Sequence, residues 1–342
     1  MKMKLFLACI ATAITACSGV SASDGYKITI PLSEDEEDAT LFLVDYDNGN
    51  KIDSVTVTNA QAVFKGRVEK PVMARLTIEG QRMGSFILEN ADITLERNKR
   101  VQSPLNDKMN DIEKELEQLV TKYRAAADAG NEADADKIKE QYNRLIAKNI
   151  KENINNPISY VLFLNEAYGY SLPELKEALK KYPELSNYVR VKKLLQAGEN
   201  KARTQPGSKF VDFAVTNDTI TQKLSDYVGK GKYVLVDFWA SWCGPCIRET
   251  QVLKDLLNQY GDDGLEVLGV AVWDDPDDTR NAIKQYGLPW PQIINAQTIP
   301  TDLYGISAIP CIMLIGPDGT ILSRDKQDEE LRAAVAKALA KK

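Results

Sequence analysis

The stretch of sequence that decides the fold of this chain is VLVDFWASWCGPC, residues 234–246. Residues 234–239 are apolar or aromatic except for one acid, which is typical of a buried strand. We expect this strand to deliver the chain to the edge of a sheet, with Cys243 at the start of the next helix. Cys246 would then lie one turn further in. The glycine and proline between the two cysteines keep that first turn compact and free of side-chain charge.

Two cysteines at this spacing can bind a metal, attach haem or cycle between dithiol and disulfide. A zinc site needs four ligands, but the chain has no histidine, and Cys311 is the one further cysteine outside the N-terminal segment. Ile247 rather than histidine follows Cys246, so the c-type haem motif is excluded. A redox dithiol remains, and we expect neither a metal nor a cofactor. The unpaired N–H groups and the positive dipole end of the helix would stabilise a thiolate at Cys243.

This segment resembles the thioredoxin signature, and the resemblance covers about residues 206–342. Within the thioredoxin family the chain is most similar to the TlpA/ResA-type membrane-tethered thioredoxins. The motifs that carry this resemblance are residues 206–215, 231–246, 290–292, 304–310 and 316–319. It implies an α/β thioredoxin fold at the C-terminus and activity as a thiol–disulfide oxidoreductase.

The resemblance also implies roles for single residues. Cys243 would be the attacking thiol and Cys246 the resolving thiol. Asp237 would be a buried carboxyl that exchanges a proton with Cys246. The alternative for Asp237 is a polar residue at the end of a strand, but an unpaired acid inside an apolar strand is costly unless it has a function.

Substrate binding is predicted for residues on both sides of the dithiol. By resemblance, Pro310 would be a cis-proline beside the cysteines, and Ile309 would offer backbone hydrogen bonds to an extended substrate. We assign Trp242, Gly244 and Pro245 to the same surface, although a tryptophan here can also be simply part of the core.

The chain departs from its relatives at two positions. Many relatives have a proline where this chain has Gln251, so we expect its active-site helix to lack their kink. Cys311 directly follows Pro310, where relatives often have threonine. Cys311 could lie near Cys243 and form mixed disulfides, tune the Cys243 thiolate, or be a small buried thiol, which is the interpretation we favour.

Strands and helices alternate in the C-terminal part, which predicts an α/β sheet with covering helices. The expected strands are 233–239, 265–273, 312–315 and 321–323, and the expected helices are 244–260, 276–286 and 328–341. Before them, residues 198–208 are polar and end in Pro-Gly, which is typical of a domain boundary. We therefore assign residues 206–342 to a thioredoxin-like domain.

Residues 103–200 are predicted to be helical. Ser103 and Pro104 suit a helix start, and residues 171–174 read as a capping box. The first helix carries an apolar stripe at spacings of three and four, made of Leu105, Met109, Ile112, Leu116, Leu119 and Tyr123. This helical region could dock a partner or a second copy, but we favour packing on its own β domain.

Residues 26–100 are predicted to form an antiparallel, sandwich-like β domain. Seven short alternating or β-branched runs are separated by turn residues, and Asn48-Gly49 is a strong hairpin signal. Residues 63–68 and 74–76, with Pro71, resemble the poorly characterised β domain that precedes thioredoxin-like domains in some Gram-negative lipoproteins.

Composition excludes several classes of function. The chain has 342 residues, of which 44% are hydrophobic and 27% charged, as in ordinary globular proteins. Its net charge of −6 argues against a broad nucleic-acid interface. The absence of histidine excludes every Ser-His and Cys-His catalytic arrangement.

The start of the chain resembles a lipoprotein signal. Lys2 and Lys4 precede an apolar stretch, residues 5–16, that is too short to span a bilayer as a helix, and Cys17 follows. We expect residues 1–16 to be removed and Cys17 to be lipidated. The alternatives are a plain secretory signal cut after Ala22, or a Cys17 that is merely a small apolar residue.

These observations predict a thiol–disulfide oxidoreductase in the cell envelope, lipid-anchored and facing the periplasm. Ser18 after the lipidated cysteine indicates the outer membrane, by resemblance to the Gram-negative sorting rule. The expected substrates are disulfides of other envelope proteins, with a membrane thiol carrier of the DsbD/CcdA type as electron donor. One alternative is a client-binding adaptor lipoprotein with a secondary dithiol. A thiol peroxidase is a weaker alternative, because the Pro-x-x-x-Thr-x-x-Cys pattern of that family is missing.

Overall fold

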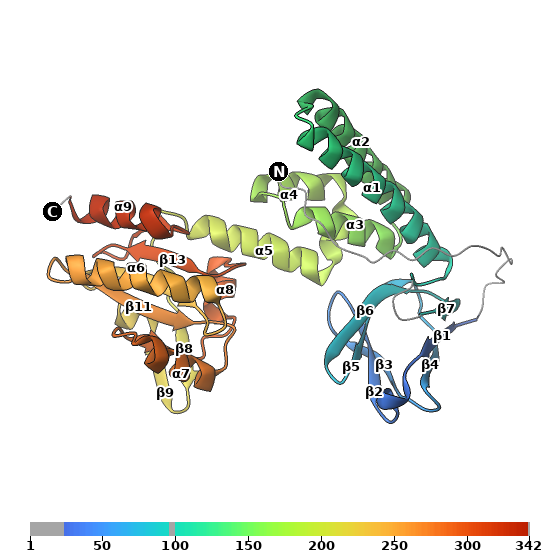
Figure 1. Ribbon diagram of the computed structural model, residues 1–342, viewed down its shortest axis with the longest axis horizontal. Helices are drawn as coiled ribbons and strands as arrows, with labels where there is room; N and C mark the ends of the chain where they lie inside the picture. Colours follow the sequence, from blue (N-terminus) through green and yellow to red (C-terminus); the bar gives the residue numbers. More distant parts are fainter. Residues whose placement is uncertain (1–23, 96–99, 341–342) are drawn as a thin grey trace. The chain divides into compact units, whose positions relative to one another are not determined.

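The computed structural model of the chain describes residues 24–95 and 100–340 (Figure 1). The predicted signal segment 1–16 and Cys17 lie outside the described residues. The chain divides into two compact units, Met1–Lys193 and Leu194–Lys342, which are described separately below. Within the described residues, no helix combines the length and the apolar character that crossing a membrane requires.

The first unit begins with the predicted seven strands, arranged in two sheets that pack face to face. The strands are β1 (Tyr26–Pro31), β2 (Thr40–Asp45), β3 (Lys51–Thr56), β4 (Gln61–Gly66), β5 (Val72–Ile78), β6 (Gln81–Leu88) and β7 (Asp92–Thr94), with a 3-10 turn η1 (Glu34–Glu36). The sheet orders are β4-β1-β7 and β3-β2-β5-β6. Alternate residues such as Ile28, Leu41 and Phe64 fill the core between the sheets. One described pairing departs from the antiparallel prediction, because β7 runs parallel to β1.

The predicted helical region follows in the same unit. It consists of α1 (Pro104–Asp128), α2 (Glu132–Glu152), α3 (Pro157–Ala167), α4 (Leu172–Lys181), η2 (Pro183–Asn187) and the beginning of α5 (Val189–Arg203). The predicted capping box holds the start of α4, where the Glu174 carboxylate accepts the Ser171 backbone N–H at 2.7 Å. Ser103 does stand at the start of α1, but its side chain does not cap that helix. Glu89 does so instead, by accepting the Leu105 backbone N–H at 2.6 Å.

Helix α5 differs from the polar linker expected over residues 198–208, because the helix continues to Arg203. Two polar residues at the C-terminal end of the helix and just after it are not solvated, although Lys201 and Arg203 between them are exposed. Asn200 and Thr204 are buried in the second unit, where the Asn200 side-chain amide donates to the Asp302 carbonyl at 2.8 Å. These two side chains, which look like linker residues in the sequence, are therefore packed and hydrogen-bonded.

The second unit contains a five-stranded sheet of order β12-β11-β10-β13-β14. Its strands are β10 (Tyr233–Trp239), β11 (Leu265–Ala271), β12 (Gln292–Ile293), β13 (Cys311–Ile315) and β14 (Ile321–Arg324). Its helices are α6 (Gly244–Tyr260), α7 (Pro276–Tyr286), α8 (Ile299–Tyr304) and α9 (Asp328–Leu339). A hairpin of β8 (Ala214–Asn217) and β9 (Ile220–Lys223), followed by η3 (Leu224–Asp226), completes the unit. Strand β10 pairs in parallel with β11 and antiparallel with β13, which matches the predicted α/β thioredoxin fold.

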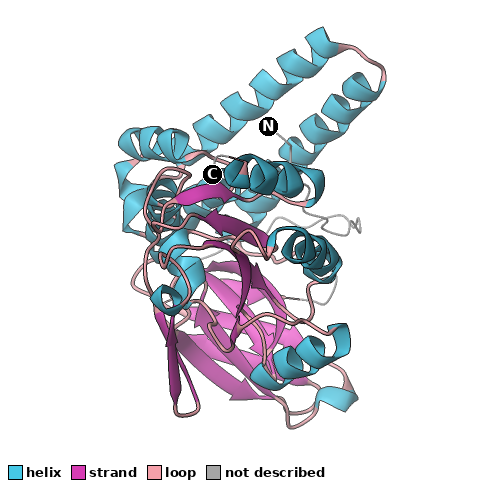
Figure 2. Ribbon diagram, turned by 90° about the vertical axis from the view of Figure 1, so that its left-hand side faces the viewer, coloured by secondary structure: helices cyan, strands magenta, loops and turns pink. Residues whose placement is uncertain are grey.

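The two faces of this sheet carry separate apolar clusters, because side chains alternate along each strand. Leu235 and Trp239 of β10 face the cluster that contains residues of α6 and α9. Val236 and Phe238 face the opposite cluster, which includes residues of the β8–β9 hairpin and Tyr304 of α8. Figure 2 colours the strands of the chain magenta and its helices cyan. Whether a residue of β10 or β13 stands at an odd or an even position therefore decides which cluster its side chain joins.

Candidate active site

A disulfide at the start of α6 forms the centre of the candidate site. Cys243 and Cys246 are bonded, with their Cα atoms 5.2 Å apart. Cys243 occupies the N-cap position, and its Sγ accepts the Cys246 backbone N–H at 3.2 Å. The chain thus places both sulfurs where the sequence predicts them, at the junction between β10 and the helix.

The surroundings of the two sulfurs differ in exposure. Cys246 is fully buried, and Cys243 is 4% exposed, so a partner sulfur can reach the first cysteine more easily than the second. Gly244 and Pro245 are exposed, and the first turn of α6 carries no acidic residue. On reduction, the positive end of the helix dipole therefore favours a thiolate at Cys243 without an opposing side-chain charge.

Asp237 lies beneath the same helix. It is 2% exposed, and its position on β10 places its side chain on the face of Leu235 and Trp239. Its Oδ1 atom has no hydrogen-bond partner. Burial, reinforced by the charge of Glu249, raises the pKa of Asp237 to about 8. A carboxyl in this state can take up and release a proton at near-neutral pH, which is the chemistry that the sequence predicts for it.

Glu249 is a second buried carboxyl that the sequence reasoning missed. It lies three residues after Cys246 on α6, is 4% exposed, and accepts the Asp328 backbone N–H at 2.9 Å. Burial raises the pKa of Glu249 above its usual range. Cys246, Glu249 and the buried Leu253 follow one another at spacings of three and four residues, which places them on one face of α6. This pattern is the signal that could have revealed Glu249 as a buried residue.

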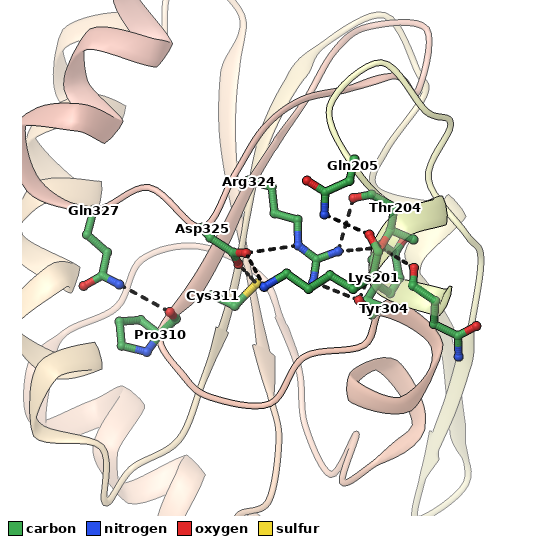
Figure 3. Close-up of polar contacts among 10 residues, drawn as sticks. Lys201, Thr204, Gln205, Tyr304, Pro310, Cys311, Arg324, Asp325 and Gln327 are labelled. Atoms are coloured by element: carbon green, nitrogen blue, oxygen red, sulfur yellow. Dashed lines mark hydrogen bonds and ion pairs between the residues drawn. The ribbon is translucent and has the colours of Figure 1, made fainter. Parts of the chain in front are cut away.

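The segment before β13 contributes to the site from the other side. The Ile309–Pro310 peptide bond is cis, as the resemblance implies. Ile309 packs against the apolar cluster that contains Cys243 and Cys246, so this segment and the dithiol are brought together. The Pro310 carbonyl accepts a hydrogen bond from the Gln327 side chain at 3.5 Å (Figure 3).

Trp242 is the most exposed aromatic group of the site. Its side chain is 61% exposed, which is unusual for a tryptophan, whereas Trp239 in the preceding strand is 1% exposed. The Trp242 indole N–H donates to the Trp273 carbonyl at 2.9 Å. The indole therefore has a fixed edge and an open face. Trp239 is a core residue, whose N–H donates to Gln292 at 3.0 Å.

Cys311 does not face the dithiol. On β13 it joins the cluster of the opposite sheet face together with Met313, whereas Ile312 and Leu314 face the disulfide side. Cys311 is 1% exposed, and its S–H donates to the Asp325 carboxylate at 3.0 Å (Figure 3). Burial, and then Asp325, raise the pKa of Cys311. This placement favours the small buried thiol over a partner of Cys243.

Figure 3 also shows what holds Asp325 in place. Its carboxylate forms ion pairs with Lys201 at 3.3 Å and with the Arg324 side chain at 3.4 Å. Arg324 is itself buried and donates to the carbonyls of Thr204 at 3.2 Å and Tyr304 at 2.8 Å, at the ends of α5 and α8. Cationic donors at helix C-termini stabilise the unpaired carbonyls there, so this cluster has a structural explanation.

The described residues contain no group of three or more cysteine, aspartate and glutamate side chains that could hold a metal ion.

Comparison with known proteins covers both units. Residues 206–324 match the model of the AhpC/TSA family, and residues 26–110 match a domain of unknown function, DUF4369. The thiol-disulfide oxidoreductase ResA of Geobacillus thermodenitrificans (strain NG80-2) is 31% identical over 122 residues, which are 35% of this chain and 69% of that protein. ResA of Bacillus subtilis (strain 168) is 31% identical over 124 residues, 36% of this chain and 68% of that protein.

A solved structure is also similar to part of the chain. The thioredoxin domain of a thiol-disulfide oxidoreductase from Bacteroides vulgatus is 29% identical, with a TM-score of 0.35. The match covers 39% of this chain and 96% of that one.

Proposed function

This chain belongs to the ResA-like family of thiol–disulfide oxidoreductases, and on that premise we propose that it reduces disulfide bonds in proteins of the cell envelope. The observation that carries the proposal is the Cys243–Cys246 disulfide at the start of α6, with the Asp237 carboxyl buried beneath it. Disulfide-containing proteins are the substrate class that the family implies. The envelope location and the reducing direction are our own additions.

The reaction begins when the Cys243 thiolate attacks one sulfur of a substrate disulfide. A mixed disulfide forms, and the other substrate sulfur leaves as a thiolate. The Cys246 sulfur then attacks Cys243, the internal disulfide forms, and the second substrate sulfur is released. The substrate gains two electrons and the dithiol loses two.

Asp237 supplies the proton transfer that the second step needs. Cys246 must lose its proton before it can attack, and it is fully buried, away from solvent. The pKa of Asp237 is raised to about 8, close to the value of about 8.5 for an ordinary cysteine. The ionised form of Asp237 can therefore accept the proton of the Cys246 thiol without a large free-energy difference, and the charge of Glu249 adds to the effect of burial at that carboxyl.

The reducing direction and the partners follow from resemblance. Gly-Pro between the two cysteines resembles reducing thioredoxins, and a reductase outside the cytosol needs electrons from inside. We propose a membrane thiol carrier of the DsbD/CcdA type as the donor. Apocytochrome c is one of the substrates that we consider among envelope proteins.

The location is proposed from the start of the chain. Residues 1–16 with Cys17 support a lipid anchor, and Ser18 supports the outer membrane. Labelling of growing cells with a radioactive fatty acid tests this. We expect label on the wild-type protein and none on Cys17→Ser, and unlabelled wild-type protein would refute the anchor.

The activity is tested by reduction of insulin disulfides with a chemical reductant as electron source. We expect turnover by the wild type and none by Cys243→Ser, while Cys246→Ser should accumulate a mixed disulfide because the resolving thiol is missing. Trapping of the thiols in intact cells tests the direction. A mostly reduced Cys243–Cys246 pair supports a reductase, and a mostly oxidised pair contradicts it.

An adaptor function is a second candidate, because the DUF4369 match coincides with a β sandwich that has its own apolar core. In this case the first unit would bind a client and the dithiol would be secondary. Binding of an envelope protein that persists in Cys243→Ser, together with negligible insulin turnover by the wild type, would favour the adaptor.

A further inference from the structure

Trp273 has a backbone conformation that bulky residues rarely adopt. It follows β11 with a φ of 54°, in the left-handed region. For a large side chain this is a genuine outlier, and such a residue carries backbone strain. Strain of this kind persists when the surrounding contacts impose it, and it concentrates at functional sites.

The contacts that impose this conformation come from both sides of Trp273. Its ring is half-buried and packs against the apolar cluster on the sheet face opposite the disulfide. Asp274, the next residue, is buried and accepts the Ser241 backbone N–H at 2.7 Å and the Ser241 hydroxyl at 2.8 Å. The Gln297 amide donates to the Asp274 carbonyl at 2.7 Å. The peptide after Trp273 is therefore held between the segment before Cys243 and the loop before α8.

The group that this arrangement presents to the active site is the Trp273 carbonyl. It accepts the indole N–H of Trp242 at 2.9 Å, and Trp242 immediately precedes Cys243. The Trp242 ring remains 61% exposed, so the hydrogen bond fixes the ring's edge without covering its face. An exposed tryptophan held in one orientation offers a flat apolar surface with little rotamer entropy left to lose on binding.

We propose that Trp273 is a positioning residue that fixes Trp242 as a platform for an apolar or aromatic side chain flanking the substrate cysteine. The proposal rests on the proposed function and names the substrate class within it. The enzyme would thus prefer extended segments in which an aromatic or large aliphatic residue lies next to the disulfide. The Asp274 contacts, which hold the start of α7, are explained by the stability of the fold alone. Stability does not explain why the Trp242 indole is fixed by its N–H edge while its ring stays open to solvent.

The test uses two disulfide-linked peptides that are identical except for tyrosine or serine beside the reactive cysteine. We expect the wild type to reduce the tyrosine peptide with a higher kcat/KM, through a lower KM. Trp242→Phe keeps an aromatic ring but loses the N–H, so the preference should fall about three- to tenfold, the range that the loss of one hydrogen bond produces. The loss should appear mainly in KM.

Trp239→Phe is the matched control, because it also deletes an indole N–H with a hydrogen bond, but in the core. It should lower the melting temperature and leave the tyrosine-to-serine preference unchanged. Trp273→Ala, which removes the ring that anchors the strained segment, should reduce the preference as Trp242→Phe does.

Each outcome tests a different part of the argument: the platform, the role of Trp273 or the proposed function. A wild type that reduces both peptides equally well overturns the platform and leaves the proposed function intact. A preference that survives in Trp273→Ala refutes the role of Trp273, whatever Trp242→Phe does. A wild type that reduces neither peptide refutes the proposed function itself.

Discussion

Two buried carboxyls beneath a disulfide are an unfavourable arrangement unless it serves the chemistry. Asp237 has an oxygen without a hydrogen-bond partner, and Glu249 adds a second acidic group close enough to raise the pKa of Asp237. An apolar side chain at either position would avoid the desolvation penalty of burying an acid. The proton that the oxidised protein holds at Asp237 is therefore a sign of function, and it is measurable.

Asp237 should make stability depend on pH. Its pKa in the folded, oxidised protein is raised to about 8, whereas an unfolded aspartate titrates near about 3.9. Between these values the folded state holds a proton that the unfolded state has released, so stability falls as the pH rises, by at most about 1.4 kcal/mol per pH unit. In Asp237→Asn the contribution of Asp237 to this slope should disappear, and the variant should gain stability relative to the wild type as the pH rises to 8. Urea unfolding of the oxidised protein at pH 4, 6 and 8 measures the effect.

An exposed carboxyl provides the control for this experiment. Asp262→Asn, on the loop after α6, changes the same functional group at the surface and should leave the slope as it is in the wild type. Parallel stability curves for the wild type and Asp237→Asn would show that Asp237 is not protonated in the folded state at neutral pH.

Glu249→Gln should move the titration of Asp237. The substitution keeps an oxygen that can accept the Asp328 N–H but removes the charge that contributes to the raised pKa of Asp237. The pKa of Asp237 should therefore fall, and the pH range in which stability is lost should move to lower pH. Carbon-13 NMR of labelled aspartate carboxyls follows this directly. A value unchanged from the wild type would mean that burial alone sets the pKa.

At the residue scale, the candidate groups that the sequence predicts are those that the local sequence pattern places. Cys243, Cys246 and Asp237 are recognisable because the buried strand and the helix start are continuous in the sequence. Glu249 and Trp273 are less visible. Glu249 looks like an ordinary polar helical residue until α9 covers it, and the conformation of Trp273 results from contacts with Asp274 that no local pattern encodes.

At the scale of elements, helix α5 depends on a cap from far away in the chain. Val189 and Arg190 donate their backbone N–H groups to the Asp47 carboxylate at 2.7 and 2.9 Å, and the Tyr160 hydroxyl donates to it at 3.0 Å. Asp47 thus acts as an N-cap for a helix 142 residues later in the sequence. It also places a negative charge at the positive end of the helix dipole.

Asp47→Ala should therefore destabilise the first unit by about 1–3 kcal/mol, because it removes a cap and leaves the Tyr160 hydroxyl without its acceptor. Asp47→Asn keeps an acceptor oxygen and should lose less. Chemical denaturation followed by circular dichroism measures both variants. Equal stability of Asp47→Ala and the wild type would contradict the role of this cap.

Element prediction succeeded where the pattern is long and failed where it is short. The seven strands of the sandwich and the long helices α1, α2 and α6 have clear periodicity. The short elements β8, β9, β12 and α8 do not, since a strand such as Gln292–Ile293 holds its place by pairing with β11 rather than by its own sequence. Residues 201–203 were missed as helix because the polar residues that flank them, Asn200 and Thr204, form hydrogen bonds with partners far away in the sequence.

At the scale of the whole molecule, the two units have separate cores and one of them contains the disulfide. Thermal unfolding should therefore show two transitions, and reduction of Cys243–Cys246 should shift only one of them, that of the second unit. Calorimetry of the wild type with and without a reductant tests this. In Cys243→Ser neither transition should respond to the reductant. A single transition that shifts as a whole would show that the units unfold together.

The order of the three kinds of segment along the chain was visible in the sequence. A β-rich segment, a helical segment and a segment of alternating strands and helices follow one another, and each has its own periodicity of apolar residues. The role of the first unit was not visible, because its residues carry no motif with a known chemistry.

The orientation of Cys311 has a practical consequence for measuring motion. Its sulfur is enclosed on the side of the sheet away from the dithiol and bound to Asp325, so an alkylating reagent reaches it only when this part of the protein opens. In a variant whose other cysteines are replaced by serine, the rate of alkylation at Cys311 reports how often the native fold fluctuates open. The chain therefore carries its own probe for transient opening, and no foreign label has to be introduced.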